Sequence, residues 1–409
     1  MTNLLIDHQC PQCGAPAVLE ETDRLFICEF CRVKSYLLEK DFFRYIIPGN
    51  APGNKELVFF PYWRFRGMFF SSLRDEIHHR FVDISRQAVD SREIPISLGL
   101  RSQALKLKFL SPETQGSFFK PKLSLKKVMR IFETSFSASL KKPLFHQAFI
   151  GETLSLIYAP FYMDSDRRQL YDAVLNKSVA SSVPEDFAVS GEQPDWQIRF
   201  VPTLCPNCGW DLKGQRDSLV LTCKNCNSVW QAGRKGLKKL IFSVLQGTGD
   251  NDVYLPFWRI KTDISGIILD SYANLVRIAN MPKAVQEGWD DIRFHFWALA
   301  FKVPPQSFLR LGSNVTLAQP NGELLPELPD APVYPVTLPV TEAVESLKIS
   351  LSNFMKPRRG LLPRLPHITM KPKSFLLVYV PFKETHHDFI HPEYQLTVNK
   401  NMLRMGGNL

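Results

Sequence analysis

All eight cysteines of this 409-residue chain fall into four Cys-x-x-Cys pairs, and in each half of the chain two pairs are separated by fourteen residues. Thiolate sulfur is a zinc ligand, and two thiolates with two residues between them can hold one ion from a single tight turn. Two such turns at the tips of neighbouring hairpins complete a tetrahedron. The predicted ligands are Cys10, Cys13, Cys28 and Cys31 in the first set, and Cys205, Cys208, Cys223 and Cys226 in the second.

The residues around the first pair of each set suit a tight turn. Both pairs read Cys-Pro-x-Cys-Gly and end in Gly14 and Gly209. Proline presets φ, and glycine permits the left-handed residue that such a turn needs. The second pair of each set is followed by Arg32 or Asn227, of which only Asn tolerates that conformation well.

Three other uses of paired cysteines compete with zinc. A disulfide framework is typical of secreted chains, and the N-terminus MTNLLIDHQC does not have the basic region of a signal peptide. A thioredoxin-like redox protein needs one such pair in a βαβ context, whereas this chain has four in two matched sets. An iron–sulfur cluster remains open, because four thiolates can hold one. Two structural Zn²⁺ ions are the favoured interpretation, and four thiolates leave no open position for a catalytic zinc.

The cysteine segments resemble a known small fold. Residues 8–34 and 203–230 each look like a zinc ribbon of the rubredoxin-like, transcription-factor-IIB type. Ribbons of this type bind nucleic acid, bind proteins or serve a purely structural role, so the resemblance implies the fold and leaves the function open. An aromatic-Pro-aromatic-Trp-Arg motif follows each ribbon and resembles that of bacterial proteins with an N-terminal ribbon. That likeness implies a β-rich domain after each ribbon and carries no activity with it.

The chain also repeats beyond its cysteines. The segments 59–66 (FFPYWRFR) and 254–261 (YLPFWRIK) match at the same offset of 195 as the ribbons, and 156–161 matches 377–382 at an offset of 221. We therefore expect an internal duplication, in which 8–160 superposes on 203–381. The extra residues of the second copy include the proline-rich stretch from Pro320 to Pro339. Trp63 and Trp258 of the motif are expected to pack in a core rather than hold a ligand.

The predicted fold class is α+β and β-rich. Expected strands cover 77–85, 196–202 and 264–271, and expected helices cover 166–179 and 341–355. The resulting domain plan is a first ribbon over 1–40, a β-rich domain over 41–180, a linker and entry strand over 181–202, a second ribbon over 203–235 and a second β-rich domain over 236–409.

Positive charge is concentrated in two segments, although the whole chain has a net charge of +10. Residues 101–145 hold ten Lys or Arg against two acids, and residues 346–373 hold seven and no acid. Patches of this size could neutralise several phosphates, dock an acidic protein or form a solvated face. The candidate contact residues are Lys120, Lys122, Lys126, Lys127, Arg130, Arg358, Arg359 and Arg364.

These features together favour a non-catalytic protein. Hydrophobic and charged contents of 44% and 22% are those of a globular chain and exclude a disordered, collagen-like or coiled-coil protein. The chain has no Gly-rich phosphate loop, no G-x-S-x-G and no H-E-x-x-H motif. No apolar run is long enough for a membrane-spanning helix, so we expect a cytoplasmic protein with reduced thiols. The expected function is a zinc-binding interaction or scaffold protein with a protein partner, and the alternative is a nucleic-acid-binding protein that uses the two basic segments.

Overall fold

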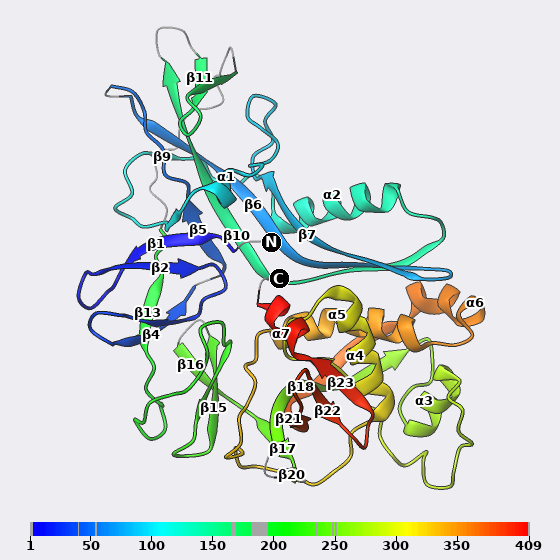
Figure 1. The fold of residues 1–409 in the computed structure, drawn as a ribbon. Coiled ribbons are helices and arrows are strands. Elements are labelled where there is room, and N and C mark those ends of the chain that lie inside the picture. The colour runs from blue at the N-terminus through cyan, green and yellow to red at the C-terminus, as the bar shows by residue number, and fades with distance from the viewer. Residues whose placement is uncertain are drawn as a thin grey trace.

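The computed structural model describes residues 3–39, 41–53, 55–164, 169–180, 195–233, 236–247, 249 and 252–407. With 41% strand and 19% helix it is an α+β, strand-rich protein, as predicted. The two halves of the chain lie one above the other, and the two cysteine-bearing segments lie together at one side (Figure 1). The chain ends are also neighbours, because Asn3 donates a hydrogen bond to the carbonyl of Gly407 at 3.4 Å.

The first half is built on a 10-stranded sheet whose longest strands, β6 (Leu57–Leu73) and β10 (Leu144–Asp164), pair antiparallel. The path β12-β11-β10-β5-β8-β1-β2 runs through it, and β6 pairs with β10, β7 and β9. Two helices accompany the sheet, and the longer begins at Ser124, whose side chain accepts a hydrogen bond from the N–H of Lys127. The remaining elements are β1 (Leu5–Gln9), β2 (Pro16–Glu20), β5 (Phe43–Ile46), β7 (Ile77–Gln87), α1 (Arg101–Ala104), β8 (Leu107–Phe109), β9 (Ser117–Phe118), α2 (Leu125–Ala138), β11 (Gln169–Asp172) and β12 (Lys177–Ala180).

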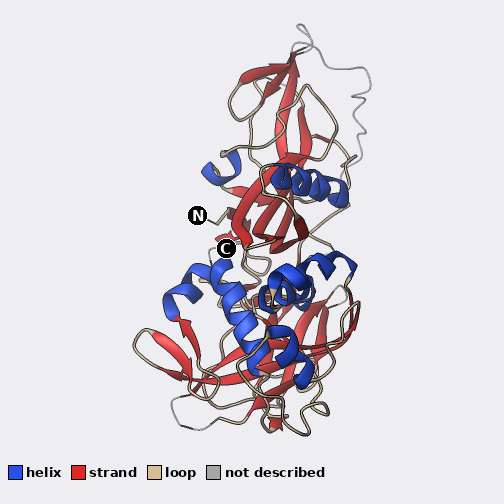
Figure 2. Cartoon of the chain, turned by 90° about the vertical axis from the view of Figure 1, so that its right-hand side faces the viewer, coloured by secondary structure: helices blue, strands red, loops and turns tan. Residues whose placement is uncertain are grey.

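The second half has a seven-stranded sheet centred on the antiparallel pair β18 (Asp252–Ser265) and β21 (Thr369–Glu384). Its order is β19-β18-β21-β17-β20, and β22 and β23 extend from β21. Helices cover one side of these strands (Figure 2). The remaining elements are β17 (Phe242–Leu245), α3 (Tyr272–Ala279), β19 (Phe296–Leu299), α4 (Pro305–Ala318), β20 (Leu324–Leu325), α5 (Val340–Phe354), α6 (Arg358–Leu361), the 3₁₀ helix η1 (Leu362–His367), β22 (Asp388–His391), β23 (Leu396–Asn399) and α7 (Lys400–Gly406).

The aromatic-Pro-aromatic-Trp motif lies in a central strand of both sheets and has the same strand register in each. Pro61 of β6 stands opposite Tyr158 of β10, and Pro256 of β18 stands opposite Tyr379 of β21. A parallel strand then covers the other edge of β10 and of β21, namely β5 in the first half and β17 in the second. The two sheets therefore share a three-strand centre.

The two tryptophans of the motif are core residues, as predicted. Trp63 is 5% exposed and Trp258 is fully buried. Each indole N–H donates to a backbone carbonyl on the segment that leads into a helix, from Trp63 to Leu123 at 2.9 Å and from Trp258 to Leu338 at 3.0 Å. A buried indole usually finds such a partner, so these bonds fix the helix entry against the sheet.

Two small sheets carry the second cysteine pair of each segment, while the first pair of the first segment lies between β1 and β2 of the large sheet. One has the order β13-β4-β3, with β3 (Leu25–Ile27), β4 (Lys34–Leu38) and β13 (Arg199–Pro202); the other has β14 (Val220–Cys223), β15 (Ser228–Gly233) and β16 (Gly236–Leu240). Strand β13 directly precedes the second cysteine set but pairs with β4 of the first. An apolar cluster then joins the two segments, made of Leu25, Tyr36, Leu38, Cys205, Leu212, Leu221, Cys223 and Trp230.

The halves are joined where the far ends of β6 and β10 pack on α5 and where β7 packs on α4. Phe70 lies near Phe308, with ring centroids 6.0 Å apart, and the N–H of Gly151 donates to Glu342 at 2.8 Å. Met68, Ala148 and other residues of these strand ends share one apolar cluster with the second half. None of the described helices is long and apolar enough to cross a membrane.

The structure confirms two of the local predictions and corrects others. Residues 77–85 lie in β7 and residues 341–354 in α5, as expected. The strand expected over 264–271 ends at Ser265, because Gly266 has a φ of 94° and Ser271 caps α3. The strand expected over 196–202 is shorter and begins at Arg199. Residues 181–194 of the predicted linker lie outside the described residues.

The helix predicted over 166–179 is wrong. Residues 169–180 form the β11–β12 hairpin instead, while 165–168 lie outside the described residues. Tyr171 stacks on Tyr162 of the neighbouring strand with ring centroids 5.3 Å apart, and Asp172 accepts a hydrogen bond from the N–H of Val174 in the turn. Pairing with β10 and turn chemistry outweigh the weak helical spacing of this segment.

Candidate metal centres

The first set of cysteines lies at the tips of two hairpins, β1–β2 and β3–β4. In each tip the residue after the second cysteine folds back, so that the N–H of Gly14 donates to Cys10 O at 2.9 Å and the N–H of Arg32 donates to Cys28 O at 3.0 Å. Both residues are left-handed, with φ of 72° for Gly14 and 61° for Arg32. The turn therefore imposes this conformation even on arginine, which adopts it at a conformational cost.

The second set repeats this geometry. The N–H of Gly209 donates to Cys205 O at 2.8 Å, and Gly209 has the same φ of 72° as its counterpart. Asn227, which follows the second pair, has a φ of 47°. The left-handed turn residues predicted from the sequence are confirmed at the first pair of both sets.

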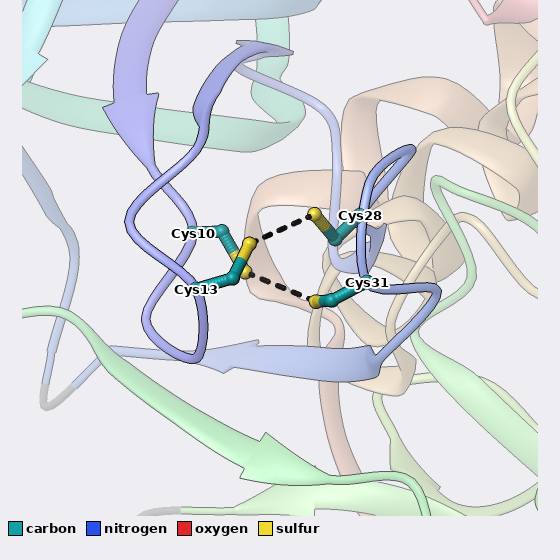
Figure 3. Close-up of side chains that lie close together, drawn as sticks. All are labelled: Cys10, Cys13, Cys28 and Cys31. Carbon is teal, nitrogen blue, oxygen red and sulfur yellow. Dashed lines mark hydrogen bonds between the residues drawn. The ribbon is translucent and has the colours of Figure 1, made fainter.

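The four thiols of each set converge on one point, as Figure 3 shows for the first set. In the first set the Sγ atoms of Cys10 and Cys31 are 3.8 Å apart and those of Cys13 and Cys28 are 3.7 Å apart. The corresponding separations in the second set are 3.6 and 3.5 Å. A tetrahedral ion with metal–sulfur bonds of about 2.3 Å would place its sulfurs about 3.8 Å apart. Both sets therefore fit a single four-coordinate ion.

The same geometry argues against two of the competing uses. All eight cysteines are free thiols, and their Sγ separations exceed the roughly 2.05 Å of a disulfide bond. A cluster of several irons would hold its four thiolates farther apart than one ion does. Within each set all ligand atoms lie within 4.8 Å of one another, which is the spacing of a mononuclear site.

Backbone N–H groups stabilise the thiolate form of one cysteine in each set. The N–H groups of Cys31 and Phe30 lower the pKa of Cys28 to about 6. Burial opposes ionisation of Cys205, but hydrogen bonds from the N–H groups of Asn207 and Cys208 bring its pKa down to about 6. These oriented donors prepare anionic sulfur, which is the form that binds a metal.

A buried group of charges fixes the first cysteine segment to the large sheet. Glu21 follows β2, is fully buried and forms ion pairs with both Arg64 and Arg66 of β6. Arg64 also binds Asp83 of β7 through two hydrogen bonds of 2.9 Å. This group was not predicted from the sequence, although two arginines in an otherwise apolar strand were a signal, since residues two apart point to the same face.

The predicted contact residues of the first basic segment lie on the surface around the start of α2. Lys120 and Lys122 precede the helix, Lys126, Lys127 and Arg130 lie within it, and all five are exposed. No acidic residue occupies the first turn of α2.

Only some of the predicted contact residues of the second basic segment are available to contact a partner. Arg359 of α6 and Arg364 of η1 are exposed. Arg358, however, donates to the carbonyls of Ser352 at 3.0 Å and of Leu73 in the first half at 3.2 Å. Its side chain thus joins the two halves and is not a free surface charge, which the sequence could not reveal.

Within the described ranges, groups of three or more possible metal ligands occur only at the two cysteine sets, so the three histidines of the segment 386–391 (HHDFIH) form no such group. No family model matches the chain, and neither a curated protein nor a solved structure matches it. Function is therefore inferred from the residues and their geometry alone.

Proposed function

We propose that this protein is a non-catalytic interaction protein, or scaffold, whose two ribbons are each stabilised by one structural Zn²⁺. The convergence of four thiols at each site is the observation that carries the proposal. Zinc prefers a closed tetrahedral thiolate site in a structural role, and such a site has no position left for a substrate. The free thiols support a location in which thiols stay reduced, such as the cytoplasm.

The proposal includes an internal duplication, in which each copy is a ribbon followed by a β-rich domain. The matched register of Pro61 with Tyr158 and of Pro256 with Tyr379 supports it. The matched indole hydrogen bonds of Trp63 and Trp258 support it as well. A duplicated ribbon–domain unit offers two related surfaces, which suits a protein that joins partners.

Two aromatic side chains mark the ribbons as contact surfaces for a protein partner. Phe30, between Cys28 and Cys31, is 68% exposed, and Trp210, two residues after Cys208, is 60% exposed. Large exposed aromatic residues are enriched in protein interfaces, and both lie on backbone that the metal site fixes.

The test combines metal analysis with partner capture. Protein purified without added metal should contain about two zinc ions per chain, one for each closed set of thiolates. A partner captured from the native host by the wild type should be lost by the Phe30→Ala/Trp210→Ala variant and retained by Ile268→Ala, which removes an equally exposed side chain far from the cysteines in sequence. Iron in place of zinc, or equal capture by all three proteins, would contradict the proposal.

Nucleic-acid binding is the second candidate, favoured by the exposed Lys126, Lys127 and Arg130 on α2. We rank it lower because Arg358, Arg359 and Arg364 of the second basic segment lie on the short helices α6 and η1, with prolines between them, and neither is a long helix that could enter a major groove.

Its test is the salt dependence of duplex binding. The apparent affinity should fall by about 0.9 log unit per log unit of salt for each phosphate neutralised. Lys126→Ala/Lys127→Ala should lower both the affinity and this slope, and Arg359→Ala/Arg364→Ala should do the same. Arg358 is left unchanged because it holds the two halves together. Weak binding of mixed-sequence DNA and RNA by the wild type at physiological salt would exclude this candidate.

A further inference from the structure

A cavity of about 370 Å³ lies between the second ribbon and the proline-rich segment 328–336. Ser218, Val220 and Thr222 of the ribbon line one side, and Pro332 to Val336 line the other. Its volume is within the range of small-molecule sites, and most of its lining is apolar. The sequence pattern singled out the proline-rich stretch as extra to the second copy, and here that stretch forms a wall.

The floor of the cavity includes a tyrosine. Tyr379 of β21 lines the cavity and is only 1% exposed. Burial raises the pKa of Tyr379, so the hydroxyl stays protonated and can donate.

Positive charge stands at the edge of the same cavity. Lys213 and Lys224 line it and are exposed, and among its lining residues the one acid is the exposed Asp330. Lys224 donates from Nζ to the backbone carbonyl of Asp330 at 3.1 Å. This contact does not pair the charge of the lysine with a carboxylate. A ligand with an anionic end and an apolar body is complementary to this arrangement.

We propose that this cavity binds a small aromatic carboxylic acid that carries a hydrogen-bond acceptor at the end opposite its carboxylate. The carboxylate faces Lys213 and Lys224, the ring packs between the valines and prolines of the two walls, and the acceptor receives the hydrogen of the Tyr379 hydroxyl. This binding activity goes beyond the proposed function and does not depend on which partner the ribbons bind.

The second ribbon holds the proline-rich wall in place. The N–H of Leu328 donates to the side chain of Asn227 at 3.3 Å, and Lys224 reaches Asp330 on the same segment. Both contacts come from the second cysteine turn, between and just after Cys223 and Cys226. The site therefore requires a folded second ribbon, whereas the first ribbon does not line it.

The matched position in the first half supplies a control. Tyr158 stands in the register of Tyr379, but it lies outside this cavity, and its ring packs edge-on against Phe118 with centroids 5.3 Å apart. Tyr158→Phe and Tyr379→Phe thus remove the same hydroxyl oxygen from matched strands, but only Tyr379 lines the cavity.

The test is calorimetric titration of the full-length, metal-loaded protein with 4-hydroxybenzoate, and with 4-hydroxybenzamide as its neutral analogue. The wild type should bind the acid saturably and the amide at least several-fold more weakly. Tyr379→Phe should lower the affinity for the acid by about 2- to 10-fold, the usual range for one lost hydrogen bond, whereas Tyr158→Phe should leave this affinity unchanged. Lys213→Met/Lys224→Met should lower the affinity for the acid to that for the amide.

Three results would overturn the inference: no saturable binding of 4-hydroxybenzoate at millimolar concentration, equal affinities for acid and amide, or equal effects of the two Tyr→Phe changes. Metal content and thermal midpoint show that each variant is folded. The Phe30→Ala/Trp210→Ala variant should retain the acid, so failure of the interaction proposal and failure of this one are distinguishable.

Discussion

The two ribbon-like cysteine segments, 8–34 and 203–230, hold their thiols in the same geometry but are attached to the molecule by different means. In the first, β1 continues the large sheet through parallel pairing with β8, and Glu21 is buried against Arg64 and Arg66. The second has its own small sheet and contacts its surroundings through the shared apolar cluster, through Val220, Val229 and Leu240 in the apolar core of the second half, and through a few hydrogen bonds. The cysteine spacing thus specifies the hairpin tips, and residues outside it determine how each ribbon is anchored.

One pair of matched positions shows this difference most clearly. Arg216 stands 195 residues after Glu21, so the charge at this position is reversed between the ribbons. Glu21 is buried among arginines, whereas the side chain of Arg216 is 61% exposed and binds Asp23 of the first ribbon at 2.5 Å. The same offset takes Arg64 to Arg259, which forms no ion pair with an acid among the described residues and lies 6.0 Å from the ring of Trp297.

Loss of one ligand from each ribbon should have the largest effects. Cys28→Ser and Cys223→Ser should each lower the zinc content from about two to about one ion per chain, because the binding energy of a structural zinc is folding energy. Cys28→Ser should also reduce amide protection in β1 and β8 of the large sheet. Cys223→Ser should leave these strands protected. Metal analysis and hydrogen exchange measure both, and identical protection maps would contradict the proposed difference in anchoring.

Removal of the buried acid should destabilise the first half by about 3–5 kcal/mol, since Glu21→Ala leaves two buried arginines short of a counter-charge. Urea unfolding measures the change. The arginines lower the pKa of Glu21, although burial opposes them. Its contribution is therefore present above the ordinary carboxyl pKa and is lost as the pH falls through the lower folded value. A loss below 1 kcal/mol at neutral pH would show that the ions are not the anchor.

The metal ligands and their turns were predictable from the sequence because they depend on residues within a few positions of one another. The same holds for α5, whose apolar stripe is local. Glu21 and its arginines are more than forty residues apart, so no local spacing could pair them. The β11–β12 hairpin was missed for a similar reason, because the strand that decides it, β10, supplies Tyr162 from outside the hairpin. The cavity beside Tyr379 needed both the ribbon and the proline-rich segment in place.

A partly buried histidine at the junction of the halves should give a smaller, pH-dependent effect. Burial, and to a lesser degree Lys348 of α5, lowers the pKa of His146 from 6.5 to about 4. The unfolded chain therefore binds a proton that the folded one rejects between these values, and stability falls as the pH falls from 6.5 to 4. His146→Gln should reduce the loss of unfolding free energy over this pH range by about 2–3 kcal/mol.

Urea unfolding at pH 7 and at pH 4.5 measures this difference. His367 is the control, because it stands 221 residues after His146 but is exposed. His367→Gln should leave the pH dependence unchanged. If both substitutions reduce the pH dependence of stability equally, the packing around His146 does not disfavour its protonation.

The smallest effect is expected at the position that matches Glu21. Arg216→Ala should cost at most about 1 kcal/mol at neutral pH, because an ion pair with one largely exposed partner gains little in water. The backbone at this position contributes the lasting contact: the carbonyl of Arg216 accepts hydrogen bonds from the N–H groups of Arg24 and Leu25, at 2.6 and 2.8 Å. Alanine retains that carbonyl, so the two ribbons should stay joined. The remaining cost should shrink further in high salt, where the charges are screened. A loss as large as that of Glu21→Ala would show that the ribbon seam depends on this ion pair, and that the two matched positions anchor their ribbons equally.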